Sequence, residues 1–285
     1  DLLLINDGGL SYSKIRFDER STSTLISHLG QLNDPIARTL AWIGVWDMWR
    51  DAELSTHDFA KLIAEGLKTE PLISLVTGLG QDLISAVEIH ADPARREELG
   101  RQIAGKVFEA LSAATAGSDI QLQLAKIFAA IANSPEQIEQ VKAILAGSLN
   151  GLTIDRDLRW YFSVTLAERG AISRAELDAT LAGDNTVNGQ LSHSEAVAAL
   201  PDPVGKAETW KQLTTTELST SQREHLSTGF MRPRHAELLA PYVDLYLNGL
   251  LEMWNSTSYE EASASVELLY PRYVICLLYT SDAAD

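Results

Sequence analysis

From about residue 20 onward, one pattern recurs along the chain: a helix start signal followed by apolar residues at three- and four-residue steps. The start signals are Ser or Asp, in several cases with a proline directly behind, as in Asp34-Pro35 and Ser134-Pro135. Ser and Asp side chains accept hydrogen bonds from the free N–H groups of a helix start, and proline has no N–H to leave unpaired there. The signals recur at roughly 15 to 25 residues and predict roughly a dozen helices of ordinary length with short loops.

Two start signals are specific enough to place a helix start. Ser21 precedes the apolar residues Leu25 and Ile26, and we expect it to cap the first helix. Ser173 has Glu176 three residues later, which is the pattern of a capping box and predicts a helix over 175–181. The next start signal lies at Pro203.

Helices joined by short loops become antiparallel neighbours, and many such pairs in series stack into a solenoid or curved superhelix. The chain shows no strict repeat consensus, such as a tetratricopeptide or ankyrin signature. We therefore predict a mostly α fold, an irregular HEAT-like α-helical superhelix (an α/α solenoid) over residues 20–273.

The first residues follow a different pattern. Alternating apolar residues at 2–6 and 11–17 flank Asn6-Asp7-Gly8-Gly9, whose residues suit the positive φ angles of a tight hairpin. We expect two strands here, as a short N-terminal β-hairpin remnant, and interpret residues 1–19 as the end of an upstream β domain. The chain begins at Asp1 without a basic segment before its first apolar run, so we do not expect a signal peptide.

At the far end, helical spacing stops after Tyr273. The string from Cys276 to Asp285 resembles translated sequencing-adapter read-through. We therefore interpret residues 274–285 as a non-native tail, treat the chain as a fragment, and give the single cysteine no role.

Composition excludes several classes of function. The chain has 39 Asp and Glu against 23 Lys and Arg, a net charge of −16, which disfavours binding to nucleic acid or to anionic lipid. No apolar run approaches the roughly 20 residues of a membrane span. We expect neither nucleic acid nor membrane partners, and one cysteine is compatible with a cytoplasmic protein.

Catalytic signatures are missing from the sequence. None of the six histidines is followed by Glu, which leaves no HExxH zinc motif, and one cysteine cannot form a Cys-based zinc site. There is no Gly-x-Ser-x-Gly nucleophile elbow and no phosphate-binding glycine loop. We therefore expect no catalytic residue, no metal site and no cofactor in this chain.

Two aromatic groups allow more than one interpretation. Trp42, Trp46 and Trp49 share one helix face, which is more often core packing than a ligand site. Arg159 and Trp160 lie in a charged and aromatic helix start. The Arg159 stem either packs on Trp160 with its head paired to a local Asp, or faces a cavity that receives a peptide carboxylate.

Several stretches resemble the C-terminal helical domain of aminopeptidase N-type (gluzincin) zinc metallopeptidases, especially those of actinobacteria. The resemblance covers most of residues 2–273 and is most persuasive at the junction between a β domain and the helical domain. The stretches that carry it are Leu3-Leu4-Ile5-Asn6-Asp7, Leu10, Tyr12, Lys14 to Arg20, Leu158-Arg159-Trp160, Lys206 with Trp210, Gly229-Phe230, and Leu238 to Tyr242.

The resemblance implies a non-catalytic role for this chain within a larger enzyme. The family's HExxH helix, distal Glu ligand and exopeptidase loop are not in this sequence. Zinc is therefore expected in the parent's catalytic domain, which would remove N-terminal residues from peptide substrates, and we expect this chain alone to be inactive. In the family the helical domain forms a bowl that encloses the active-site chamber and limits peptide access. Arg159 and Trp160 are our candidates for lining that chamber. The alternative is a HEAT-like helical scaffold for protein–protein interaction.

Overall fold

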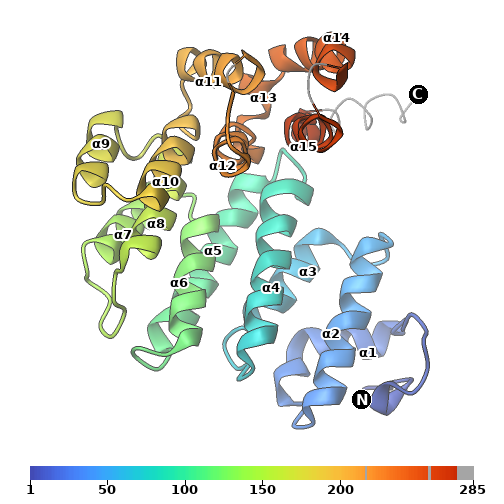
Figure 1. Ribbon diagram of the computed structural model, residues 1–285. Helices are drawn as coiled ribbons and strands as arrows, with labels where there is room; N and C mark the ends of the chain where they lie inside the picture. The colour runs from blue at the N-terminus through green and yellow to red at the C-terminus, as the bar shows by residue number, and fades with distance from the viewer. Residues whose placement is uncertain (216, 256–257, 275–285) are drawn as a thin grey trace. The chain divides into compact units, whose positions relative to one another are not determined.

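The computed structural model describes residues 1–215, 217–255 and 258–274. In these ranges the regular secondary structure is helical, which confirms the mostly α class (Figure 1). The chain divides into two compact units, Asp1–Thr153 and Ile154–Asp285. Residues 275–285, including Cys276, lie outside the described residues, while Val274 is buried in the core of the second unit.

The first unit contains seven α-helices among its described residues, with short 3-10 turns at Asp7–Gly9 (η1) and Leu29–Gln31 (η2) and a π-helical turn at Ala86–His90 (η3). Helix α1 packs on α3, α3 packs on α5, and α4 packs on α6, so a helix meets the next but one as stacked helical pairs require. The α-helices are α1 (Glu19–His28), α2 (Pro35–Arg50), α3 (Thr56–Gly66), α4 (Ile73–Ser85), α5 (Arg96–Ala113), α6 (Asp119–Ile131) and α7 (Pro135–Leu145).

The second unit repeats this packing, with α8 on α10 and α10 on α12, while α14 and α15 form a further pair. A short 3-10 turn, η4 (Pro233–His235), precedes α13. The α-helices are α8 (Arg156–Glu168), α9 (Arg174–Ala182), α10 (Val187–Ala198), α11 (Pro203–Thr215), α12 (Thr220–Phe230), α13 (Ala236–Leu239), α14 (Pro241–Asn255) and α15 (Tyr259–Leu269).

The capping predictions have mixed outcomes. Ser173 forms the predicted capping box, because its hydroxyl accepts from the Glu176 N–H and its own N–H donates to Glu176 Oε2. The prediction for Ser21 is wrong. Asp18 is the N-cap of α1, and its carboxylate accepts from the Ser21 N–H at 2.8 Å, so the helix begins one turn earlier than expected.

The predicted strands at 2–6 and 11–17 are also wrong, although the turn between them is present. Asn6 has a left-handed φ of 64°, its carbonyl accepts from Gly9 N–H, and its side-chain amide bonds to both backbone groups of Ser11. The Asn6 side chain thus closes the turn, and no ladder of backbone pairs extends from it. Leu3 N–H instead donates to the Ser21 hydroxyl on α1, so this segment packs against helices within the chain.

Trp42, Trp46 and Trp49 form a stripe on α2, which we call the tryptophan stripe, and its contacts confirm the predicted core packing. Trp42 and Trp49 are buried, and the Trp49 ring stacks on Phe59 with centroids 4.4 Å apart. The indole N–H of the half-buried Trp46 donates to Asp82 at 3.2 Å. The stripe therefore ties α2 to α3 and α4 within the first unit.

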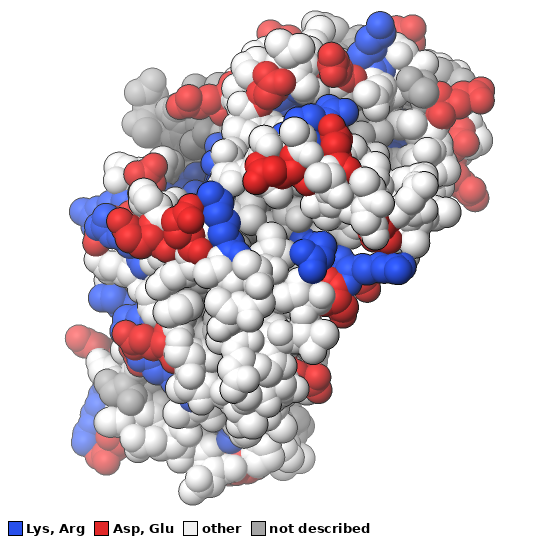
Figure 2. All heavy atoms as spheres, turned by 90° about the vertical axis from the view of Figure 1, so that its left-hand side faces the viewer, with Lys and Arg blue, Asp and Glu red and all other residues white. Residues whose placement is uncertain are grey.

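Figure 2 shows charged residues of both signs on one face of the molecule. Lys and Arg side chains lie next to Asp and Glu side chains there, and do not form the continuous basic stripe typical of a nucleic acid-binding surface. Among the described residues, no helix combines the length and apolar character needed to cross a membrane.

Candidate functional site

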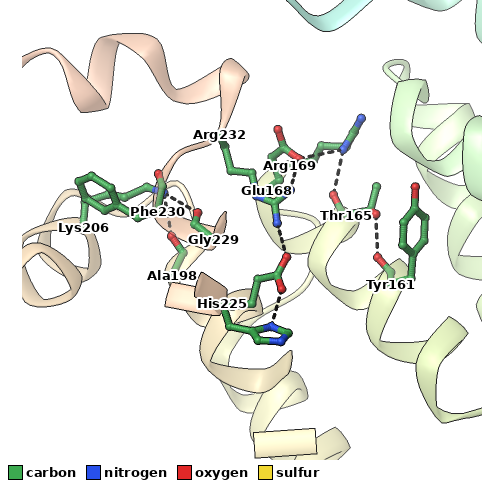
Figure 3. A network of polar contacts seen from close by, with 11 residues as sticks. Tyr161, Thr165, Glu168, Arg169, Ala198, Lys206, His225, Gly229, Phe230 and Arg232 are labelled. Atoms are coloured by element: carbon green, nitrogen blue, oxygen red, sulfur yellow. Dashed lines mark hydrogen bonds and ion pairs between the residues drawn. The ribbon is translucent and has the colours of Figure 1, made fainter. Parts of the chain in front are cut away.

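The second unit gathers an ion cluster at the ends of three helices (Figure 3). We define this cluster as Glu168 at the end of α8, Arg169 directly behind it, Glu195 in the last turn of α10, His225 on α12, and Arg232 two residues after α12. The packing of α10 between α8 and α12 brings these side chains together although they are up to 64 residues apart in sequence.

Glu195 is the centre of the ion cluster. Its Oε1 accepts from Arg232 Nη2 at 2.8 Å, and its Oε2 lies 2.8 Å from His225 Nδ1. Both carboxylate oxygens are thus engaged, one with a side chain in the middle of α12 and the other with a side chain two residues after that helix. The Glu195 and Arg232 side chains are largely buried, whereas His225 remains 34% exposed and is the member that solvent reaches most easily.

Glu168 forms the looser half of the ion cluster. Its Oε2 lies 3.8 Å from Arg169 Nη1 and 3.9 Å from Arg232 Nη1. Arg169 Nη1 also donates to the Thr165 carbonyl at 3.0 Å, which holds the guanidinium against α8. Arg232 therefore bridges two carboxylates, and two guanidinium groups balance two carboxylates.

A buried lysine lies on the neighbouring helix α11. Lys206 is 1% exposed, and its Nζ donates to the carbonyls of Ala198 at 2.7 Å, Phe230 at 2.9 Å and Gly229 at 3.2 Å. These carbonyls lie at the C-terminal ends of α10 and α12, where the helix dipole favours a cation. Burial lowers the pKa of the Lys206 amine to about 7.

Two further titratable groups have strongly shifted pKa values. His235 Nε2 lies 2.8 Å from the Glu168 carbonyl, which requires the proton on that nitrogen. Burial lowers the pKa of His235 to about 4, so the ring is neutral at pH 7. Burial also raises the pKa of the Tyr161 hydroxyl on α8 to about 12. The surroundings of the ion cluster thus favour neutral forms.

This geometry indicates that the ion cluster and Lys206 hold helices in place and do not catalyse a reaction. The carboxylates of the ion cluster are held by cations, and Lys206 is enclosed by backbone carbonyls. In the described parts of the chain, no group of three or more His, Cys, Asp or Glu side chains could hold a metal ion. The ion cluster and Lys206 fasten the ends of α8, α10 and α12 to one another.

The structure separates the two candidate residues of α8. Arg159 is exposed, whereas Trp160 is buried in a second core with Leu177 and Ala196. The Trp160 indole N–H donates to Asp184 Oδ2 at 3.0 Å and holds the pKa of that carboxyl below its usual range. The cation that lies near Asp184 is Arg156, at 3.6 Å, and no contact places Arg159 in the ion cluster.

Several residues that carry the family resemblance are neighbours in the structure. Lys206 meets Gly229 and Phe230, and the Phe230 ring lies 5.9 Å from Trp210 and 5.0 Å from Tyr242. The stretches that carry the family resemblance in the second half of the chain therefore meet in one core. Glu195 and Arg232 were not predicted, because no helix was expected between the starts at Ser173 and Pro203, and without α10 nothing connects these two residues. The start signal of this helix is Thr186, whose side chain caps α10 by accepting from the Gly189 N–H.

Comparison with known proteins shows the family of this chain. The ERAP1-like C-terminal domain family matches residues 2–275. Aminopeptidase N of Streptomyces lividans is 37% identical over 273 residues, which are 95% of this chain and 32% of that protein. The chain thus spans about a third of the length of this curated relative. Together these matches confirm the resemblance to the C-terminal domain of aminopeptidase N-type enzymes, and the chain belongs to the ERAP1-like C-terminal domain family.

Proposed function

We propose that this chain is the non-catalytic C-terminal domain of a zinc aminopeptidase that removes N-terminal residues from peptides. In that role it helps to enclose the active-site chamber and to control which peptides enter. The observation that carries the proposal is the family match over residues 2–275, together with a relative named Aminopeptidase N that is about three times longer, since the chain covers 32% of it.

The metal belongs to another part of such an enzyme. Zinc in peptidases is held by His and carboxylate side chains that converge on one point. Among the described residues no such set occurs, and the carboxylates of the ion cluster are occupied by arginine and histidine. The residues present do not fit a zinc ion, so we derive no step through the metal from this chain.

Arg159 and Trp160 receive different roles in this proposal. Arg159 is exposed on α8 and can offer its guanidinium to a peptide carboxylate in the chamber. Trp160 is buried beside it with its N–H bound to Asp184, so it supports the helix that presents Arg159. We thus propose Arg159 as a chamber residue that contacts peptide and Trp160 as its packing support.

A chimeric enzyme tests the proposal. The matched region of the Streptomyces lividans enzyme is replaced by residues 2–274 of this chain, and a second protein lacks that region altogether. We expect the chimera to cleave a dipeptide and to discriminate against a long peptide, and the shortened enzyme to lose this discrimination. Equal ratios of kcat/KM for long and short peptides in both proteins would contradict a role in peptide access.

Arg159 is tested within the same chimera. Arg159→Ala is expected to raise the KM for peptides several-fold with little change in kcat, because it removes a binding contact and not a catalytic one. Lys211→Ala removes another exposed cation, on α11, and serves as the matched control. A KM that does not change in Arg159→Ala would remove this residue from the chamber.

The isolated chain provides a second test. Without an upstream catalytic domain, we expect no release of N-terminal amino acids from peptides when zinc is added. Zinc-dependent turnover by the purified chain would overturn the assignment as a non-catalytic domain.

A further inference from the structure

Helix α14 carries apolar side chains on more of its surface than the core uses. Val243 and Tyr246 are buried, and Leu250 and Met253 pack partly against the same core. A second row, Leu247, Leu251 and Trp254, follows at i, i+4 and i+7, which places the three side chains on one side of the helix. We call this row the outer stripe of α14, the helix that Figure 1 labels.

The outer stripe is open to solvent. Leu247 is 54% exposed, Leu251 74% and Trp254 42%. The Trp254 ring contacts Tyr259 at the start of α15 edge-to-face at 5.6 Å, and Tyr259 is itself exposed, so the apolar surface continues onto the next helix. A helix that is apolar on most sides is normally covered on most sides, and contiguous exposed apolar surface marks interaction sites.

Along the chain from α13 to α15, the charged side chains are all of one sign. From Ala236 to Pro271 the sequence contains six acidic residues and no Lys, Arg or His. All six acidic residues are exposed, and Asp244 lies one turn before Leu247 on the outer side of α14. These residues are Glu237, Asp244, Glu252, Glu260, Glu261 and Glu267.

The apolar row and the acidic residues together indicate which kind of partner binds the outer stripe. A row spaced at i, i+4 and i+7 matches the apolar stripe of another helix, and the acidic residues of α14 and of the first turn of α15 attract Lys and Arg. A second copy of this chain would bring the same acidic residues against them, and an anionic membrane would be repelled. We propose that the outer stripe of α14 is a docking surface for an amphipathic helix of a partner protein that carries Lys or Arg beside its apolar row.

The proposal is independent of the aminopeptidase assignment and is tested by binding. The probe is a fluorescent peptide of about 18 residues, five helical turns, with leucines on one face and lysines on the other. One control peptide has glutamate in place of lysine, and another has the same composition in an order without an apolar face. We expect the full chain to bind the first peptide alone, and more weakly as salt is raised.

Variants locate the binding surface. Leu247→Ser with Leu251→Ser is expected to weaken binding by at least about tenfold, because both apolar anchors are lost. Val187→Ser on α10 removes a side chain that is 73% exposed, nearly as exposed as Leu251, and should bind like the unaltered chain. Since all three side chains are exposed, we expect the variants to remain folded, and their thermal unfolding is followed as a check.

Several results would overturn the proposal. These are equal binding by the double variant, equal binding of the glutamate peptide, or no binding of the lysine peptide to the unaltered chain. If sedimentation shows that the unaltered chain is a dimer and the double variant is a monomer, the outer stripe binds a second copy of the chain. Binding to vesicles of neutral lipid that is lost in the double variant would assign it to a membrane.

Discussion

Glu195 binds Arg232 and His225 through its two carboxylate oxygens, at 2.8 Å each. Replacing it by glutamine keeps the shape but removes the charge and turns one acceptor oxygen into an N–H donor, so Arg232, which can only donate, loses its charged partner. We expect Glu195→Gln to lower the free energy of unfolding by about 2 kcal/mol, since a largely buried guanidinium loses its nearest carboxylate. Urea unfolding at pH 7 measures the change.

The matched control for that substitution is Glu139→Gln on α7. Glu139 lies 2.9 Å from Lys142, and both side chains reach solvent, being 68% and 41% exposed. Exposed pairs of this kind contribute at most about 0.5 kcal/mol. Equal losses in the two variants would mean that burial adds nothing to the ion cluster.

His235 gives the fold a pH dependence of known sign. Burial lowers the pKa of His235 to about 4 in the folded chain, whereas the ordinary value is 6.5. Between these values the unfolded chain binds the proton and the folded chain does not, so the stability contributed by this residue falls as the pH drops from 6.5 to 4. Lys206 and Arg232, both cations, act in the same direction, and Glu168 opposes them.

His235→Gln tests this sign. The glutamine amide can still donate to the Glu168 carbonyl but does not titrate. We expect the variant to gain about 2–3 kcal/mol relative to the unaltered chain between pH 7 and pH 4.5, measured by urea unfolding at both values. His28→Gln, at an exposed position on α1, should show no such gain. If the difference stays constant with pH, His235 is not the neutral group that its burial indicates.

At the scale of residues, the sequence identified side chains better than it identified their partners. Lys206, Trp210, Gly229 and Phe230 belonged to the family resemblance, and the structure brings them together. The pairing of Glu195 with His225 could not be predicted, because it depends on α10 lying against α12 and no local pattern carries that information.

Helix α12 approaches α10 so closely that one position admits only glycine. A methyl group on Gly229 would collide with the Glu195 carbonyl oxygen and lie 2.9 Å from the Ala198 side chain. We expect Gly229→Ala to destabilise the chain by about 1–3 kcal/mol, because the two helices must move apart. Thermal and urea unfolding measure the loss.

The contrasting substitution is Gly105→Ala on α5, where an added methyl group meets no atom within 4 Å. Alanine is the better helix former there, so this variant should gain up to about 1 kcal/mol. If Gly229→Ala also raised the stability, the space between α10 and α12 would be large enough for a methyl group, contrary to this prediction.

At the scale of elements, local sequence patterns predicted several helix starts. They did not predict secondary structure that depends on contacts with distant parts of the chain. The capping box at Ser173 was predicted to the residue. Helix α10 was missed because its sequence has no strong apolar row and contains Gly189. The N-terminal strands were wrong because alternation alone does not make a strand: Leu3, Ile5, Leu10 and Tyr12 are exposed, and no partner strand lies within the described residues.

At the scale of the whole molecule, the chain has two compact units, each with its own buried core. The first comprises 153 residues and the second 132, which lies within the size range of domains that fold alone. The tryptophan stripe of α2 belongs entirely to the first unit, and the ion cluster with Lys206 belongs entirely to the second. Each of these groups of interactions is therefore made within one unit.

This division predicts that the two units fold separately. Residues 1–153 and 154–285, expressed as two proteins, should each give a helical circular dichroism spectrum and a cooperative thermal transition. Because the ion cluster lies in the second unit, Glu195→Gln should lower the transition of the second fragment, as it lowers the stability of the full chain, and it has no counterpart in the first. A second fragment that is unfolded alone, or whose transition is insensitive to Glu195→Gln, would mean that its stability depends on the first unit and not on the ion cluster.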